Sequence, residues 1–204
     1  MKAMVLKGAC LIETGGRKPL ELVDLPVPVI TPDQILIKVS ACGICHTEID
    51  EIEGRLVPPQ FPIVPGHEIV GNVHAVGSEV RKYKPGVRVG VAWIHSTCGR
   101  CSFCARGDEN LCDDFRATGL HAHGGYAEYT VVSQDFAYPI PQTFTDSEAA
   151  PLLCAGVIGY RALRLSKIKS GEVLGLYGFG ASAHIAIQVA KHQGCKVFVF
   201  TREG

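Results

Sequence analysis

The chain has 204 residues, 47% of them apolar, and its 20 basic and 20 acidic residues give a formal net charge of zero. That length accommodates one large domain or two small ones with a sizeable core. Zero net charge provides no attraction for nucleic acid or an acidic membrane surface, so it favours small, neutral or weakly charged partners.

The sequence also lacks targeting and membrane signals. No run reaches the roughly 18 apolar residues that a membrane helix needs, and residues 1–6 lack the apolar region and cleavage site of a signal peptide. We therefore expect a cytoplasmic protein. Because the cytosol keeps thiols reduced, its nine cysteines are not expected to form disulfides. Metal binding explains clustered cysteines, and scattered ones are interpreted as small buried residues.

Short strands separated by glycine and proline dominate the first 150 residues. Examples are residues 34–39, 69–76 and 125–132, and a turn signal stands at residues 84–86. Many short strands with turn residues between them are typical of an irregular all-β barrel. We therefore predict a β-barrel domain over residues 1–150.

The hydrophobic pattern changes at residue 151. An apolar helix, a buried strand, an amphipathic helix and a second strand are predicted at residues 151–165, 173–177, 181–193 and 196–200. The last three elements form one βαβ unit, the opening of a doubly wound dinucleotide-binding sheet. Because such a sheet has six strands, residues 151–204 are expected to form only part of the domain, either in a fragment or in a natural truncation.

A cluster of cysteines provides the most specific signal, at Cys98, Cys101, Cys104 and Cys112. Closely spaced thiolates can reach one ion because a tight turn directs their sulfurs to the same point. Four thiolates complete the tetrahedral coordination of Zn²⁺ and leave no open position, which marks a structural site. An iron–sulfur cluster is the main alternative, but the last spacing differs from that of bacterial ferredoxins. We predict a structural zinc ion.

Three further residues stand in short motifs that are unspecific when taken singly. Cys45 lies in CGICHTE, His67 in GHE and Cys154 in PLLCAG. A lone histidine or an apolar-flanked cysteine is more often a core residue, and Cys42 with Cys45 can also form a metal or redox CxxC pair.

The order of the motifs resembles the medium-chain zinc alcohol dehydrogenase family, in particular its microbial members. The series is CGICHTE, GHE, the cysteine cluster, GGYAEY, PLLCAG and a glycine-rich turn at residues 178–180, so it covers the whole chain. The resemblance implies α+β and α/β architecture, with a GroES-like β-barrel catalytic domain followed by the first βαβ unit of a Rossmann domain. It also implies a homo-oligomer for a full-length form.

By motif position, the resemblance implies a catalytic zinc bound by Cys45, His67 and Cys154, whose fourth position is open to substrate. Cys42 matches no ligand. Glu68 would lie beside the ligands and assist ligand exchange, and a plain ion pair is the alternative role. Thr47 would receive the proton of the alcohol, whose pKa the metal lowers, while a hydride passes to nicotinamide.

Other matched positions concern the proton relay, the cofactor and the substrate. Asp50 occupies the position of a relay histidine in many members, and its usual pKa near 4 suits that task less well. His46 matches a contact with the cofactor pyrophosphate, or else is a surface histidine. Trp93 and Ile52 match the substrate pocket. There Trp93 would favour small primary alcohols and Ile52 would relax that restriction, with a core role as the alternative for Trp93.

The glycine-rich turn follows a predicted strand and opens a predicted helix, as a dinucleotide fingerprint does. Gly178 would make the tight turn, Gly180 would let the pyrophosphate approach the helix N-terminus, and Ala183 replaces the third glycine. After the second strand, Thr201 and Arg202 stand where NAD-specific proteins carry an acidic residue. This favours NADP slightly over NAD, although Glu203 lies close by.

The leading functional hypothesis is a zinc-dependent oxidoreductase that interconverts small alcohols and aldehydes or ketones with NAD(P). It would carry two zinc ions per chain. The alternative is a catalytically inactive zinc-binding fragment that lacks a complete cofactor site. A zinc-free relative of the quinone reductases is disfavoured, because such relatives lack both cysteine sets.

Overall fold

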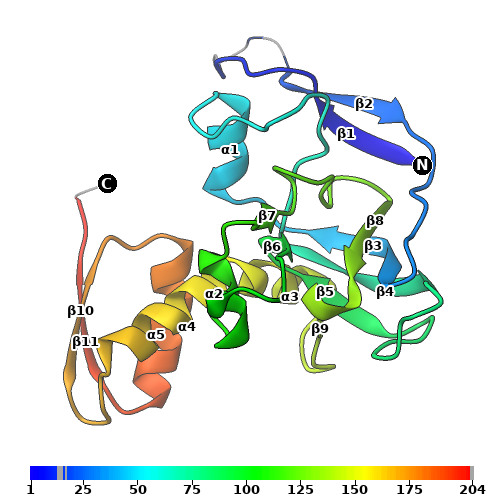
Figure 1. The fold of residues 1–204 in the computed structure, drawn as a ribbon. Coiled ribbons are helices and arrows are strands. Elements are labelled where there is room, and N and C mark those ends of the chain that lie inside the picture. Colours follow the sequence, from blue (N-terminus) through cyan, green and yellow to red (C-terminus); the bar gives the residue numbers. More distant parts are fainter. Residues whose placement is uncertain (13–15, 17, 203–204) are drawn as a thin grey trace. The chain divides into compact units, whose positions relative to one another are not determined.

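The computed structural model describes residues 1–12, 16 and 18–202 (Figure 1). Two compact units divide the chain, Met1–Leu153 and Cys154–Gly204. Among the described residues, no helix combines the length and the apolar character that a membrane crossing requires.

An antiparallel sheet of five strands, in the order β8-β3-β4-β5-β9, is the centre of the first unit. Its strands are β3 (Gln34–Cys42), β4 (Ile69–Val76), β5 (Arg88–Val91), β8 (Tyr129–Ser133) and β9 (Ala137–Pro139). Two antiparallel pairs complete the β-structure: β1 (Lys2–Leu6) with β2 (Leu20–Asp24), and β6 (Ile94–Ser96) with β7 (Arg116–Ala117).

Apolar side chains cover both faces of the five-stranded sheet. Successive side chains of a strand point to opposite faces, so the neighbours Ile69 and Val70 of β4 enter different clusters, and both are 0% exposed. Ile69 belongs to the main core, together with Ile35 and Ile37 of β3. Val70 packs instead with residues that precede the second unit.

Short helices connect the strands of the first unit. They are α1 (His46–Ile52), α2 (Ser102–Ala105), α3 (Asp146–Ala149) and the 3₁₀ turns η1 (Glu109–Leu111), η2 (Gln134–Phe136) and η3 (Ala150–Leu153). Cys45 is the N-cap of α1, and its backbone N–H donates to the Glu48 carboxylate at 2.6 Å as one half of a capping box. Such reciprocal capping satisfies N–H groups that a helix start leaves without partners.

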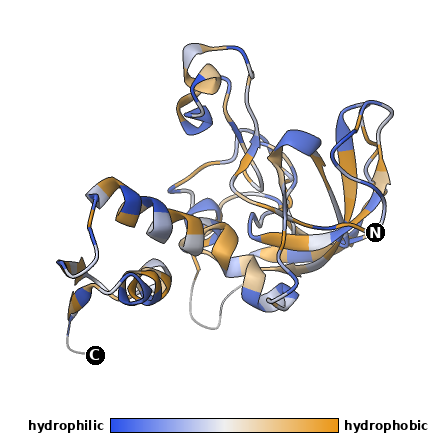
Figure 2. Ribbon diagram, turned by 90° about the horizontal axis from the view of Figure 1, so that it is seen from below, coloured by the Kyte–Doolittle hydropathy of each residue, from blue (hydrophilic) through white to orange (hydrophobic). Residues whose placement is uncertain are grey.

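The second unit contains α4 (Ala155–Ser166), β10 (Val173–Tyr177), α5 (Ala181–His192) and β11 (Lys196–Phe200). Strands β10 and β11 pair in parallel with α5 between them in the chain, so the predicted βαβ unit is confirmed. The helices pack through Leu163 of α4 and Ala186 and Ala190 of α5. Figure 2 shows that the helices carry both hydrophobic and hydrophilic segments, as this one-sided packing requires.

Two predicted elements have different bounds in the structure. The helix expected over residues 151–165 is divided, because Cys154 leaves helical geometry (φ −127°, ψ −77°) between η3 and α4. The strand expected over residues 125–132 starts only at Tyr129. The backbone N–H groups of Gly124 and Gly125 donate to the carbonyl groups of Val64 and Gly66, so this stretch does not pair with a neighbouring strand of the sheet.

The prediction that residues 173–177 form a buried strand is wrong for the described part of the chain. Side chains alternate between exposed and half-buried along both β10 and β11. Val173 is 61% exposed and Tyr177 is 85% exposed. Leu174 and Val197, on the other face, pack against the helical cluster. An apolar run indicates two covered faces, whereas only one face of this strand pair is covered here.

Candidate metal centres

The four clustered cysteines converge in the first unit. Their sulfurs all lie within 4.8 Å of one another, and no disulfide joins any of the described cysteines. The Cys101 and Cys104 sulfurs are 3.5 Å apart, and those of Cys98 and Cys104 are 3.9 Å apart. Sulfurs at the corners of a tetrahedral zinc site, each 2.3 Å from the ion, are about 3.8 Å apart. These two spacings are close to those of a tetrahedral zinc site, so the donor set of this four-cysteine site fits a zinc ion.

Backbone amides support thiolate charge in this cluster. The Cys101 N–H donates to the Cys98 sulfur at 3.3 Å, and the Cys98 N–H donates to the Cys112 sulfur at 3.4 Å. The backbone amides of Arg100 and Cys101 lower the pKa of Cys98 to about 6. Burial and hydrogen bonds with Cys98 and Cys104 raise the pKa of Cys112 to about 11, so negative charge is shared unevenly among the four thiols. Metals bind thiolates rather than thiols, so a cation at this site would displace the remaining protons.

A second group brings together the three predicted ligands Cys45, His67 and Cys154, with Glu68 beside them. One possible ligand atom from each lies within 4.8 Å of the others. Cys45 immediately precedes α1, His67 precedes β4, and Cys154 follows Leu153 at the start of the second unit. Two sulfurs, an imidazole and one carboxylate form a donor set that Zn²⁺ accepts, and a site with three such ligands keeps a position open.

Glu48 and Trp93 hold the His67 ring from two sides. The Glu48 Oε1 atom lies 2.7 Å from His67 Nδ1, and both side chains are almost fully buried, at 3% and 1% exposure. The Trp93 ring packs edge-on, with ring centroids 4.9 Å apart. A carboxylate at Nδ1 leaves Nε2 as the nitrogen that can bind a metal, and it fixes the ring orientation.

Cys42 lies near this site but is not in the group of possible ligand atoms. Burial, with Glu48 and Glu68 nearby, raises the pKa of the Cys42 thiol to about 12. Its side chain packs against the main core. That Cys42 is no zinc ligand stays a prediction.

The other predicted residues of α1 differ in their surroundings. The Thr47 hydroxyl lies 3.5 Å from the Cys45 sulfur, so it adjoins the three-ligand site. The His46 side chain is 75% exposed, and its Nε2 lies 3.7 Å from Asp50, which also accepts from Arg55 at 2.6 Å. Ile52 is 6% exposed and packs in a core cluster. Its place in a substrate pocket stays a prediction.

Within the second unit, the predicted fingerprint has the expected local geometry. Gly178 follows β10 with φ +90°, a conformation that residues with a Cβ rarely adopt. Gly180 is the N-cap of α5, and Ala183 lies in the first turn of that helix. Thr201 and Arg202 are exposed after β11, and Glu203 lies outside the described residues.

Glu51 is a buried carboxyl group that the sequence analysis missed. It is 0% exposed, and neither of its oxygens has a hydrogen-bond partner among the described residues. Burial and the neighbouring carboxylates of Glu48 and Asp50 raise its pKa to about 8. A signal was present, because Glu48, Glu51 and Ile52 share one face of a helix at spacings of three and four.

Because of Glu51, the free energy of unfolding is expected to fall as the pH rises from acidic to mildly alkaline values. A carboxyl group whose pKa is raised by folding holds its proton more firmly in the native state. Its favourable contribution is therefore complete below about pH 4.5 and is lost as the pH rises through about 8. Glu51→Gln should remove this loss, so denaturant unfolding should show a variant that is more stable than wild type at pH 9. The exposed Glu79→Gln serves as the matched control, and an equal pH dependence in wild type and Glu51→Gln would contradict the prediction.

Comparisons with known proteins agree with this architecture. The sequence profile described as the alcohol dehydrogenase GroES-like domain matches residues 31–142. A Mycobacterium tuberculosis protein described as a probable alcohol dehydrogenase is 50% identical over 189 residues, which cover 90% of this chain and 55% of that protein. The chain therefore spans about half the length of the curated relatives that it matches.

Two solved structures are close in fold. One is a Helicobacter pylori protein solved as a complex with NADP(H), with a TM-score of 0.85 and 29% identity, over 100% of this chain and 60% of that one. The other is a thermostable alcohol dehydrogenase from Pyrobaculum aerophilum with cobalt and zinc bound, with a TM-score of 0.89 and 27% identity over the same shares. The chain belongs to the medium-chain alcohol dehydrogenase family through its GroES-like domain.

Proposed function

We propose that this chain forms the catalytic domain and the first part of the cofactor domain of a zinc-dependent oxidoreductase that interconverts small alcohols with aldehydes or ketones. The convergence of Cys45, His67 and Cys154 carries the proposal, because three such ligands leave one position for substrate. Family membership and the two metal-compatible groups support it. The thiolate ligands suit a reducing compartment such as the cytosol.

The site residues have separate tasks in this proposal. When bound, zinc supplies a Lewis acid for the substrate oxygen. Thr47, beside the ligand Cys45, accepts the alcohol proton through its hydroxyl oxygen and donates its own proton to the cofactor ribose. Asp50, which is partly exposed on α1, continues the relay toward solvent. Glu48 keeps His67 oriented through Nδ1. Trp93 forms a bulky wall beside His67 and limits the size of the substrate.

Glu68 is assigned to the control of ligand exchange. Its side chain is 3% exposed and belongs to the same group of donor atoms as the three ligands. A carboxylate at that distance can replace a departing ligand for a moment and so ease the exchange of substrate and product. The four-cysteine site is assigned a purely structural role, because its four thiolates would complete the coordination of a zinc ion.

The alternative function is a zinc-binding polypeptide without activity. The described residues contain two strands of a parallel sheet, whereas dinucleotide domains of this type have six. Zinc analysis and titration with NAD(P)H separate the two proposals for the 204-residue chain. Two zinc ions with cofactor-dependent alcohol oxidation support the enzyme. Two zinc ions without NAD(P)H binding at millimolar concentration support the inactive polypeptide, and absence of zinc contradicts both.

For the cofactor, we propose NADP in preference to NAD. Support comes from Thr201 and Arg202 after β11, because an acidic residue at this place would repel the 2′-phosphate of NADP. Arg202→Leu should weaken NADPH binding by about tenfold, the loss of roughly one charge-assisted hydrogen bond, and leave NADH binding almost unchanged. Fluorescence titration of both cofactors is the measurement, with the exposed Arg161→Leu as the control. Equal effects on both cofactors would contradict the assignment.

A further inference from the structure

The segment that leads to Cys154 is fixed on the sheet of the first unit at two places. It consists of α3 and η3, Asp146–Ala149 and Ala150–Leu153, and its last residue is bonded directly to Cys154. An ion pair holds its beginning, and an apolar surface of the sheet receives its end. Whatever fixes this segment therefore limits where the Cys154 sulfur can lie.

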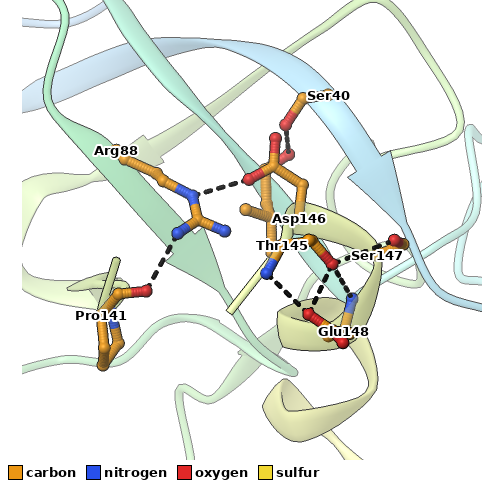
Figure 3. Close-up of polar contacts among 8 residues, drawn as sticks. Ser40, Arg88, Pro141, Thr145, Asp146, Ser147 and Glu148 are labelled. Carbon is orange, nitrogen blue, oxygen red and sulfur yellow. Dashed lines mark hydrogen bonds and ion pairs between the residues drawn. The ribbon is translucent and has the colours of Figure 1, made fainter. Parts of the chain in front are cut away.

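The ion pair joins Arg88 of β5 to Asp146, the first residue of α3. Figure 3 shows the guanidinium group between two acceptors: Nε donates to Asp146 at 2.6 Å, and Nη1 donates to the Pro141 carbonyl at 3.0 Å. The Arg88 side chain is only 13% exposed. Ser40 and then Arg88 hold the pKa of Asp146 below its usual value, so the carboxylate stays charged. A partly buried, charge-assisted contact of this kind is stronger than an exposed one.

The helix start next to Asp146 is itself well ordered by capping. The Thr145 N–H donates to the Glu148 carboxylate at 2.9 Å, and the Glu148 N–H donates to the Thr145 hydroxyl at 3.3 Å (Figure 3). This reciprocal arrangement satisfies N–H groups at the start of α3. Asp146 is therefore presented to Arg88 from a fixed backbone.

The apolar surface, which we call the seat, consists of Ala41, Val70 and Gly90. These residues are direct neighbours across β3, β4 and β5. Leu153 packs into this cluster and is 8% exposed. A Cβ atom on Gly90 would lie 2.9 Å from the Leu153 methyl groups and 2.7 Å from Ile140 Cδ1. Only glycine allows Leu153 to approach β5 so closely.

The strands of the seat also lead to the other two ligands. Strand β3 ends at Cys42, shortly before Cys45, and β4 begins at Ile69, directly after His67 and Glu68. The same three-stranded surface therefore carries two ligands on its connections and receives the segment that ends at the third. The position of Cys154 depends on how firmly that segment is held.

We propose that Arg88, acting through Asp146, is a positioning residue for the three-ligand metal site. It keeps the Cys154 sulfur at bonding distance from an ion held by Cys45 and His67. The inference rests on the proposed function, since it assumes that this site binds a metal. A metal site needs metal–ligand distances within about 0.2 Å of their usual values. Loss of groups that orient ligands typically lowers metal affinity about 10- to 100-fold.

Cobalt titration of the metal-depleted chain tests the proposal, because Co²⁺–thiolate bands report each site without any need for activity. The spectrum of Cys154→Ala isolates the bands of the four-cysteine site. Arg88→Met is expected to weaken cobalt binding at the three-ligand site at least tenfold and to leave the four-cysteine site unchanged. Arg88→Lys, which keeps the charge, should recover most of the affinity. Lys82→Met removes the exposed contact with Asp135, 2.5 Å long, and should change neither site.

The outcomes separate the inference from the proposed function. If wild type binds metal only at the four cysteines, the proposed function fails and the inference is overturned with it. If wild type fills both sites and Arg88→Met fills both with the same affinity, the positioning role alone is overturned. If Arg88→Met also loses the cobalt bands of the four-cysteine site, the same titration of Gly90→Ala tests the positioning role instead. This variant displaces Leu153 without removing a charge, and a selective loss at the three-ligand site would support the proposal, whereas unchanged affinity would overturn it.

Discussion

Replacing Cys154 by alanine is expected to remove one of two zinc ions and to lower the rate of alcohol oxidation by about a thousandfold or more. A Lewis acid at the substrate oxygen is worth several kcal/mol in the transition state, and each 1.4 kcal/mol is about a factor of ten. Cys154 sits with Cys45 and His67 in the three-ligand group. Metal analysis counts the ions, and reduction of NAD(P) follows the rate.

Cys195→Ala is the matched control for this prediction. Cys195 is buried in the second unit at 7% exposure and lies outside both metal groups. The Cys195→Ala variant should retain both zinc ions. A Cys154→Ala variant that keeps two zinc ions and full activity would contradict the assignment of Cys154 as a ligand. If Cys154→Ala loses one ion and the wild-type chain is inactive, the ligand assignment stands and the alternative function is supported.

Replacing Cys112 by alanine is expected to remove the other zinc ion and to destabilise the first unit severely. Binding at structural zinc sites is worth about 10 kcal/mol or more, which is comparable with the whole stability of a domain, about 5–15 kcal/mol. Few apolar side chains replace the ion here, because Cys98, Cys101 and Cys104 are only half-buried and α2 has no buried residue. Thermal unfolding with and without a chelator measures the effect.

Cys10→Ala provides the comparison for this second variant, since Cys10 is half-buried, lies outside both metal groups and only packs beside the Leu6 and Ile52 cluster. It should lose neither ion. If Cys112→Ala unfolds at the same temperature as wild type, the four-cysteine site does not contribute to stability. If chelation destabilises wild type and leaves the already destabilised Cys112→Ala variant unchanged, the stabilising ion is the one held by the four cysteines.

Local spacing was sufficient for several features of this protein. The four cysteines lie within a short stretch, so their convergence depends on tight turns and one helical turn rather than on the whole fold. Strands β10 and β11 and helix α5 follow from hydrophobic period and from glycine at positive φ, both of which are short-range effects.

The three-ligand site is different, because its ligands come from three distant stretches. Nothing in the residues around Cys45, His67 or Cys154 requires them to meet, and only the order of motifs in a known family suggested it. In the structure the sheet brings them together, since β3 and β4 are paired neighbours and the Leu153 segment packs on the same strands. Strand pairing is a long-range contact that residue period does not specify.

Burial was the property that sequence reasoning predicted least well. Glu51, an ionisable residue on a short helix, is fully buried, whereas Tyr177, an aromatic residue in an apolar strand, is almost fully exposed. Helical phase placed Glu51 beside Ile52, but the exposure of either residue depends on which elements pack against it. A pattern shows which side chains share a face, and only the packed structure shows whether that face is covered.

The sequence by itself therefore determined the family resemblance, the four-cysteine site and the βαβ unit, because each depends on residue types at short and regular spacing. Tertiary structure decided the His67–Glu48 contact, the buried acid at Glu51 and the fixation of the Cys154 segment by Arg88. The physical reason is that these features depend on desolvation and on contacts between remote strands. Both arise only when the sheet has formed.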